Sequence, residues 1–384
     1  MKKLLIVATI PETLTNFFTY ITKHLQNRGW YVDGMAVGIS RDSQCLKLFD
    51  NVWDVDWSRN PLYPNNLLVA PKQIQAIYEQ NQYDIVNITT PVAAFVTRFA
   101  LKDWQKQGKV KIIYTAQGFH FYSGGAFHRN ITFLTLEKIA APWTDYLVVV
   151  NREDEEAAKQ HHLAPKGRVR LIPGTGLNVK RFDHDAISEI EVKRVKQELG
   201  LTPQTPLLLS VAELIKRKHP EDILRGFALL NSEELHLAFA GDGVLMGKMQ
   251  QLAKNLKVEN RVHFLGYRRD IPLLIRASIA TILASEQEGL PNCVMESLSM
   301  ETPVIGTDIR GTRDLLEAGY GLLVKVGDIE GIACGMKWML DNSQAAAMMG
   351  KRGCDSLVAY DVPHIIEEYE RLYGESISAE LAMV

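Results

Sequence analysis

SEQEGLPNCVMESLSM, residues 285–300, is the stretch of this sequence that best predicts the fold. The apolar run ATILA at 280–284 comes directly before it and has the length of a buried strand. Gly289 and Pro291 mark a turn after that strand. Apolar residues at helical spacing follow the turn, so we expect a helix to begin near Asn292. A strand, a short loop and a helix in this order are typical of an open α/β sheet.

The same stretch carries carboxylates on both sides of the predicted helix start. Glu288 lies on the loop beyond the end of the strand, and Glu296 lies about one turn inside the helix. Ligands of open α/β sheets bind at this edge, and the free N–H groups of a helix start attract anions. Two carboxylates that accept hydrogen bonds from hydroxyls, with an anion site between them, would suit an anionic sugar nucleotide.

The rest of the chain repeats the strand–helix rhythm, which predicts parallel sheets with helices on both faces. The expected strands of the first half are 4–9, 31–37, 83–89, 111–115, 146–150 and 169–173. Those of the second half are 206–211, 235–240, 262–265, 280–283, 303–305 and 321–324. We therefore predict an α/β protein of two doubly wound, Rossmann-like domains facing each other across a cleft.

A polar stretch without a strong apolar strand separates the two halves. We expect a first domain at 1–177, a crossover linker at 178–200 and a second domain at 201–360. The C-terminal segment, 361–384, contains a helical pattern.

The composition is that of a globular protein, with 46% hydrophobic and 23% charged residues. The formal net charge of −2 argues against a strongly cationic nucleic-acid-binding protein. The four cysteines are widely separated, which suggests reduced thiols in a cytoplasmic protein. No clustered set of His, Asp and Glu shows the spacing of metal ligands, so we expect neither a metal ion nor another cofactor.

Residues 288–311, EGLPNCVMESLSMETPVIGTDIRG, resemble the donor-site segment of the family 4 glycosyltransferases. The resemblance implies retaining glycosyl transfer and a GT-B fold, whose terminal helix crosses back to the first domain. It also implies that Glu288 is catalytic. Donor-binding residues implied in the same way are Gly289, Leu290, Pro291, Asn292, Glu296, Arg310 and Gly311.

The segment VAELIKRK, residues 211–218, follows the first strand of the second domain. By the resemblance, Lys218 would contact the diphosphate and stabilise the departing nucleotide, because negative charge grows on the leaving group. Glu213 stands where relatives often have an arginine, and Arg217 could compensate. Backbone groups beside Tyr267 would contact the nucleotide base.

The segment YTAQGFHF, residues 114–121, resembles the acceptor-side loop of the family. Many relatives have histidine at the position of Gln117, whose amide could only hydrogen-bond the transferred sugar or the acceptor. His120 could make the same contacts and could titrate. Packing of His120 at a strand end is an equal alternative.

The leading hypothesis is a retaining glycosyltransferase that moves a hexose or N-acetylhexosamine from a UDP-sugar to an acceptor hydroxyl. The resemblance to capsule and exopolysaccharide enzymes implies a lipid-linked or saccharide acceptor. One alternative is a sugar-nucleotide epimerase of the same fold. Another is a non-catalytic subunit that binds a sugar nucleotide or a glycan. Consumption of the donor with and without an acceptor distinguishes the three.

A lipid-linked acceptor would place the protein at the inner membrane surface, as a peripheral contact, since no apolar run approaches the roughly 20 residues of a membrane span. The predicted helix at 16–28 would carry Phe17, Tyr20, Ile21 and Leu25 on one face. A membrane patch could combine cations and aromatic residues, namely Lys2, Lys3, Lys23 and Arg28 with Phe17, Phe18 and Tyr20. Basic residues near an anionic surface contribute about 1 kcal/mol each.

Overall fold

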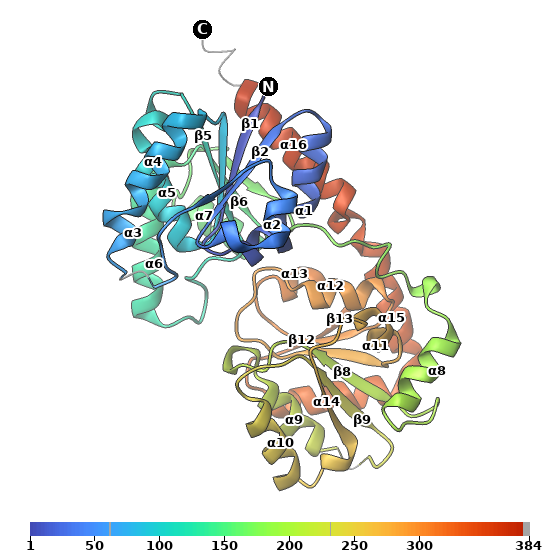
Figure 1. The fold of residues 1–384 in the computed structure, drawn as a ribbon. Coiled ribbons are helices and arrows are strands. Elements are labelled where there is room, and N and C mark those ends of the chain that lie inside the picture. The colour runs from blue at the N-terminus through green and yellow to red at the C-terminus, as the bar shows by residue number, and fades with distance from the viewer. Residues whose placement is uncertain (61–62, 231, 379–384) are drawn as a thin grey trace. The chain divides into compact units, whose positions relative to one another are not determined.

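The structure is a computed structural model, and it describes residues 1–60, 63–230 and 232–378. The chain divides into two compact units (Figure 1). Unit 1 combines Met1–Gly176 with the C-terminal segment from Val362, and unit 2 is Leu177–Asp361. Each unit contains one parallel sheet with helices on both faces. This confirms the predicted pair of doubly wound domains and the return of the C-terminal helix to the first one.

The sheet of unit 1 has seven strands in the order β3-β2-β1-β4-β5-β6-β7, and every pairing is parallel. The strands are β1 (Lys3–Val7), β2 (Tyr31–Ala36), β3 (Val52–Asp54), β4 (Ile85–Thr89), β5 (Lys111–Ala116), β6 (Tyr146–Val149) and β7 (Val169–Leu171). The central strands are buried, as continuous apolar runs require when both faces of a parallel sheet are covered.

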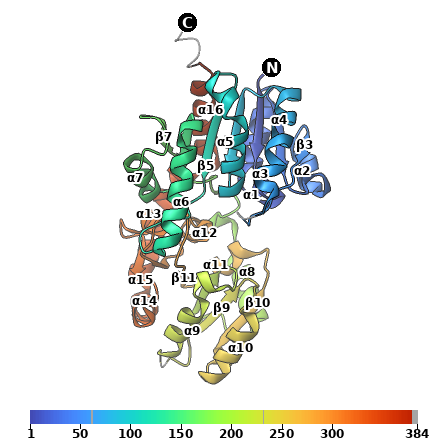
Figure 2. The ribbon, with the colours of Figure 1, turned by 90° about the vertical axis from the view of Figure 1, so that its left-hand side faces the viewer.

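Helices cover the two faces of this sheet in separate groups (Figure 2). One face is covered by α3 (Asn65–Leu68), α4 (Ala70–Asn81), α5 (Pro91–Lys106), α6 (Phe127–Ala140) and α7 (Arg152–Gln160). The other face is covered by α1 (Pro11–Asn27), α2 (Ser43–Leu48) and α16 (Val362–Ser378). Helix α16 buries Ile365, Tyr369 and Tyr373 in the same core as Leu14 and Phe18 of α1, which holds the C-terminal helix on unit 1.

The sheet of unit 2 has six strands in the order β10-β9-β8-β11-β12-β13, again all parallel. The strands are β8 (Leu207–Val211), β9 (His236–Ala240), β10 (Val262–Gly266), β11 (Ala280–Leu283), β12 (Val304–Thr307) and β13 (Gly321–Val324). The helices are α8 (Glu189–Glu198), α9 (Pro220–Ala228), α10 (Met246–Asn255), α11 (Ile271–Arg276), α12 (Asn292–Ser299), α13 (Thr312–Leu316), α14 (Ile329–Asp341) and α15 (Ser343–Asp355).

The strand orders reverse at one point in each sheet. In unit 1 the strands that follow β1 in sequence are added on one side of it, whereas those that follow β4 are added on the other side. In unit 2 the same reversal occurs between β8 and β11. The loops after such a pair of strands diverge and leave a crevice at the carboxyl end of the sheet. The loop after β8 contains Lys218, and the loop after β11 contains Glu288.

The crossover is the main difference from the predicted architecture. Residues 178–200, expected to form a linker, belong to unit 2 and include α8. Phe182, Val192 and Val195 are buried in the core of unit 2, which they share with strand and helix residues. These apolar residues are widely spaced and do not form a strand pattern, so no sequence pattern indicates that they would pack into the core of unit 2.

Candidate functional site

Lys218 and Glu288 form an ion pair at the switch point of unit 2, although they are 70 residues apart in sequence. Arg217 donates from Nη1 to the carbonyl oxygen of Gln287 at 2.5 Å, and the same atom lies 3.7 Å from Glu288 Oε2. Arg310 donates from Nε to the carbonyl oxygen of Glu288 at 3.0 Å. Cations from two other loops therefore surround the loop that carries Glu288.

Backbone and side-chain contacts hold these loops together. The amide of Glu286 donates to the carbonyl oxygen of Arg217 at 3.0 Å. His219 has a φ of 48° and ends the short turn that presents both cations. Its ring contacts Asp222 at 2.7 Å and Glu286 at 3.3 Å. Burial disfavours the charged ring, but the hydrogen bonds to these carboxylates outweigh burial and raise the pKa of His219.

Gly311 brings the loop after β12 against the Glu288 loop. Its φ is 74°, and a Cβ at this position would lie 2.0 Å from the carbonyl oxygen of Gly289. Only glycine tolerates both the left-handed conformation and this approach. The amide of Gly311 donates to the carboxylate of Asp314 at 3.0 Å. Arg310 and Gly311, predicted to contact the donor sugar, thus lie beside Glu288 and Gly289.

The first turn of α12 faces the same loop. The helix begins at Asn292 as predicted, and Pro291 caps it without a side-chain hydrogen bond. The first N–H groups of a helix have no partner inside the helix, and they carry partial positive charge. The sequence Gly289-Leu290-Pro291-Asn292 therefore connects Glu288 to the first N–H groups of α12, those of Asn292 and Cys293, an arrangement that suits a diphosphate.

Glu296 lies on α12 one turn beyond its start and is mostly buried. Burial raises the pKa of Glu296 to about 7, while the charge of Arg181 opposes the shift. Burial also raises the pKa of Cys293 to about 12; the charge of Lys218 opposes this shift, and Glu288 and Glu296 add to it. At neutral pH the Glu296 carboxyl can therefore accept or donate a hydrogen bond.

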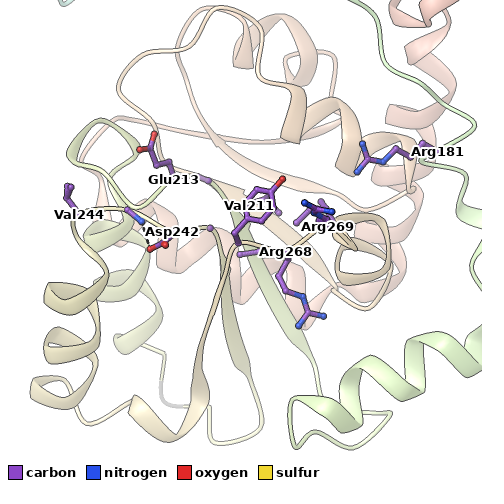
Figure 3. A pocket seen from close by; sticks show the side chains of 13 residues that line it. Arg181, Val211, Glu213, Asp242, Val244, Arg268 and Arg269 are labelled. Carbon is purple, nitrogen blue, oxygen red and sulfur yellow. Dashed lines mark hydrogen bonds between the residues drawn. The ribbon is translucent and has the colours of Figure 1, made fainter. Parts of the chain in front are cut away.

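A cavity of about 1010 Å³ opens at the carboxyl end of β8, β9 and β10 (Figure 3). Glu213 and Asp242 lie on one side of it, and Arg181, Arg268 and Arg269 on the other. Arg268 forms a two-point ion pair with Asp270, whereas the exposed Arg269 has no polar partner among the described residues. The lining residues are Arg181, Val211, Ala212, Glu213, Ala240, Gly241, Asp242, Gly243, Val244, Tyr267, Arg268, Arg269 and Ile271.

This cavity brings predicted residues together with residues that the sequence pattern does not single out. Tyr267 lines the cavity with 77% of its surface exposed, as a platform for a planar base would be. Glu213, the departure from the family pattern, also lines it. Arg181 lines the cavity and acts electrostatically on Glu296, which is not itself a lining residue. Arg181 and Arg269 carry no sequence signal, because charged residues on polar loops are common.

Unit 1 has a smaller cavity, about 300 Å³, at its own switch point. Thr9 after β1 and Thr90 after β4 line it, and their hydroxyl oxygens are 2.6 Å apart. His120 lines this cavity, and its ring lies 4.9 Å from that of Phe133. Gln117 is not among the lining residues, and its buried Nε2 finds no hydrogen-bond partner within the described part of the chain.

The predicted membrane patch is wrong in one essential residue. Phe18 is only 1% exposed because α1 turns it into the core, whereas Tyr20, expected on the buried face, is 45% exposed. Arg28 lies 3.7 Å from Glu370. A buried phenylalanine cannot enter a bilayer, so Phe18 is lost from the predicted patch, whereas the exposed Tyr20 remains available.

Metal-ligating clusters and membrane-spanning helices are both missing from the described part of the chain. No group of three or more His, Cys, Asp or Glu side chains there is arranged to hold a metal ion. None of the described helices has both the length and the apolar character that crossing a membrane demands.

Comparison with known families matches both units. Residues 14–175 match the family described as "Glycosyltransferase Family 4", and residues 191–355 match "Glycosyl transferases group 1". The chain is 31% identical over 376 residues to "Putative glycosyltransferase EpsD" of Bacillus subtilis, covering 97% of this chain and 96% of that protein.

A second relative is the Escherichia coli "UDP-Gal:alpha-D-GlcNAc-diphosphoundecaprenol alpha-1,3-galactosyltransferase". It is 24% identical over 322 residues, which cover 81% of each chain. Among solved structures, Anabaena HepE in complex with UDP superimposes with a TM-score of 0.77 at 18% identity, covering 98% of this chain and 100% of that one. This last likeness concerns the fold, which is GT-B.

Proposed function

We propose that this chain, which belongs to the family 4 glycosyltransferases, transfers a hexose or N-acetylhexosamine from a UDP-sugar with retention of configuration. The acceptor is a hydroxyl of a lipid-linked glycan in polysaccharide synthesis. The observation that carries this proposal is the convergence of Lys218, Arg217 and Arg310 with the free start of α12 around Glu288. Cations and N–H groups would bind a diphosphate, and the neighbouring carboxyls would hold sugar hydroxyls.

In this proposal the donor diphosphate competes with Glu288 for Lys218. Lys218 and Glu288 are both largely buried, with side chains 15% and 11% exposed, so their charges interact strongly. When a diphosphate takes over the ammonium group, the Glu288 carboxylate becomes available to the transferred sugar. Negative charge on the departing UDP then grows next to Lys218 and Arg217, which lowers the barrier.

The nucleoside is proposed to occupy the large cavity of unit 2. Tyr267 offers an exposed ring beside backbone groups for the base. Glu296 would accept hydrogen bonds from ribose hydroxyls, close to Arg181. The names of the relatives support a UDP-sugar, since one of them uses UDP-Gal and the fold relative HepE binds UDP.

The acceptor is proposed to bind unit 1 at the Thr9–Thr90 switch point, where His120 lines the smaller cavity. His120 would hydrogen-bond the acceptor. Retention would follow from attack on the same face that UDP leaves, with a donor phosphate oxygen taking the acceptor proton. In unit 2, the side chains of Lys218, Arg217 and Arg310 would bind the diphosphate in place of a divalent metal ion.

A panel of nucleotide sugars tests the proposal by thermal shift. A ligand that binds only the folded state raises the melting temperature. At a ligand concentration of 100 times Kd, the free energy of unfolding increases by about 2.7 kcal/mol. UDP and one UDP-sugar should stabilise the wild type and the Lys216→Ala control, whose cation is exposed on the same turn. Lys218→Ala should reduce the UDP shift. Chemical-shift mapping that places UDP on unit 1 alone would contradict the proposal.

A further inference from the structure

A second cavity of unit 1, about 290 Å³, lies between helices and is not used by the proposed reaction. Helix α5 supplies Pro91, Val92, Phe95 and Val96, while α3 and α6 supply the remaining walls. Its lining residues are Asn66, Leu67, Pro91, Val92, Phe95, Val96, Thr132, Phe133, Leu136 and Glu137. We refer to it as the α5–α6 cavity.

The few polar groups of this cavity are already engaged by the protein. Glu137 forms an ion pair with the buried Arg98 at 2.7 Å. The Asn66 amide donates to the carbonyl oxygen of Asn60 at 2.9 Å, and its oxygen accepts from the amide of Ser58 at 2.9 Å. The walls that remain are apolar, so the cavity offers a ligand hydrophobic contact and little hydrogen bonding.

The surface around the cavity is also apolar. Leu67 lines the cavity and is 57% exposed, and its neighbour Leu68 is 65% exposed. Neighbouring exposed apolar side chains mark a binding surface more often than single ones do.

The other end of the cavity leads to the acceptor site. Pro91, Val92 and Phe133 line both the α5–α6 cavity and the His120 cavity. Arg59 lines the His120 cavity, is exposed and has no polar partner among the described residues. The guanidinium of Arg129 lies 6.0 Å from the Phe133 ring. One cation therefore lines the His120 cavity, and another lies close to a ring that both cavities share.

We propose that the α5–α6 cavity holds the hydrocarbon chain of a lipid-linked acceptor, with the diphosphate at Arg59 and Arg129. The proposal rests on the proposed function, because it places the acceptor's sugar beside His120. The apolar cavity would suit the chain of such a molecule, and the adjoining cavity with Arg59 and His120 would suit its diphosphate and sugar. The E. coli relative acts on a diphosphoundecaprenol-linked acceptor, a molecule of this chemistry.

Binding of farnesyl diphosphate to the full-length protein tests this assignment. Inorganic diphosphate serves as the chain-free control, and isothermal titration gives both affinities. Farnesyl diphosphate should bind at least about tenfold more tightly, equal to about 1.4 kcal/mol. Leu67→Asp and Thr132→Asp should each remove this advantage, since they put charge in the walls. Leu46→Asp, at a leucine of α2 that is 52% exposed, should keep it.

UDP binding is measured on every variant, because the proposed UDP site lies in unit 2. Unchanged UDP affinity shows that unit 2 of each variant is folded, and unchanged hydrogen exchange of the buried strand β4 shows the same for unit 1. Equal affinity for farnesyl and inorganic diphosphate, with normal UDP binding, would overturn the cavity assignment alone. Leu67-dependent binding to phosphatidylcholine vesicles without farnesyl binding would also overturn it, in favour of a bilayer-docking surface. Failure of the wild type to bind UDP would instead count against the proposed transferase reaction.

Discussion

Replacing Glu296 by glutamine should stabilise unit 2 at high pH. The carboxyl is buried on α12, and its pKa rises from 4.5 to about 7 in the folded protein. A raised folded pKa means that stability is complete below 4.5 and is lost as the pH rises through about 7. Glutamine stays neutral, so the variant avoids this loss. Its gain in unfolding free energy over the wild type equals the extra free energy that ionising Glu296 costs in the folded chain compared with the unfolded chain.

The size of the effect follows from the pKa values in the folded and unfolded chain. Linkage predicts an advantage of about 3 kcal/mol at pH 8 and about 2 kcal/mol at pH 6. At pH 4.5 the advantage should fall below about 0.5 kcal/mol. The charge of Arg181 is already included in the shift, so Arg181→Ala should raise the pKa of Glu296 further and enlarge the difference at pH 8.

Hydrogen exchange in a urea series measures the difference in unfolding free energy between variant and wild type for unit 2 alone. Peptides that contain β11 (Ala280–Leu283), whose residues are fully buried, report the unfolding free energy of this unit. Wild type and variant are compared at the same pH, so that the chemical exchange rate cancels. Glu213→Gln, an exposed carboxyl in the same unit, is the matched control and should change little. A Glu296→Gln advantage that is absent at pH 8, or equally large at pH 4.5, would refute the argument from burial.

Lys218→Ala should lower kcat about 100-fold or more while the donor KM changes less, because the leaving-group charge is largest in the transition state. Steady-state kinetics beside the Lys216→Ala control decide this, and an unchanged kcat with a raised KM would mean that Lys218 contributes equally to ground-state binding. Activity should persist in excess EDTA; loss with rescue by Mn²⁺ or Mg²⁺ would show that the reaction needs a metal ion. Gly311→Ala should cost roughly 1–3 kcal/mol in urea unfolding, because its Cβ would lie 2.0 Å from the Gly289 carbonyl oxygen, and an unaltered midpoint would contradict that contact.

Local sequence pattern is sufficient for the elements that build both units. The apolar runs that form β1, β4, β8 and β11 are long enough to be predicted as buried strands, and the start of α12 at Asn292 follows from Gly289 and Pro291. The short edge strand β3 escapes prediction, since three residues show no alternation. The predicted face of α1 is confirmed at Ile21 and Leu25, which are buried, and is wrong at Tyr20, because periodicity alone does not say which of several neighbouring aromatic residues enters the core.

For the charged residues of the site, too, the sequence predicts some features and the tertiary structure decides others. Glu288, Glu296 and Lys218 stand out in their motif segments from the order of residues alone. Their pairing does not, because Lys218 and Glu288 meet only when β8 and β11 become neighbours in the sheet. The pKa of Glu296 likewise depends on burial by surrounding helices and on Arg181, a residue far away in the sequence.

What the sequence by itself determined is therefore the order of strands and helices, the loops that follow them and the residue types on those loops. The tertiary structure decided which loops converge, which carboxyl is desolvated and where the α5–α6 cavity opens. The physical reason is the range of the interactions. Turn formation and helix periodicity act over a few residues, whereas burial and charge pairing depend on segments brought together by the parallel sheets.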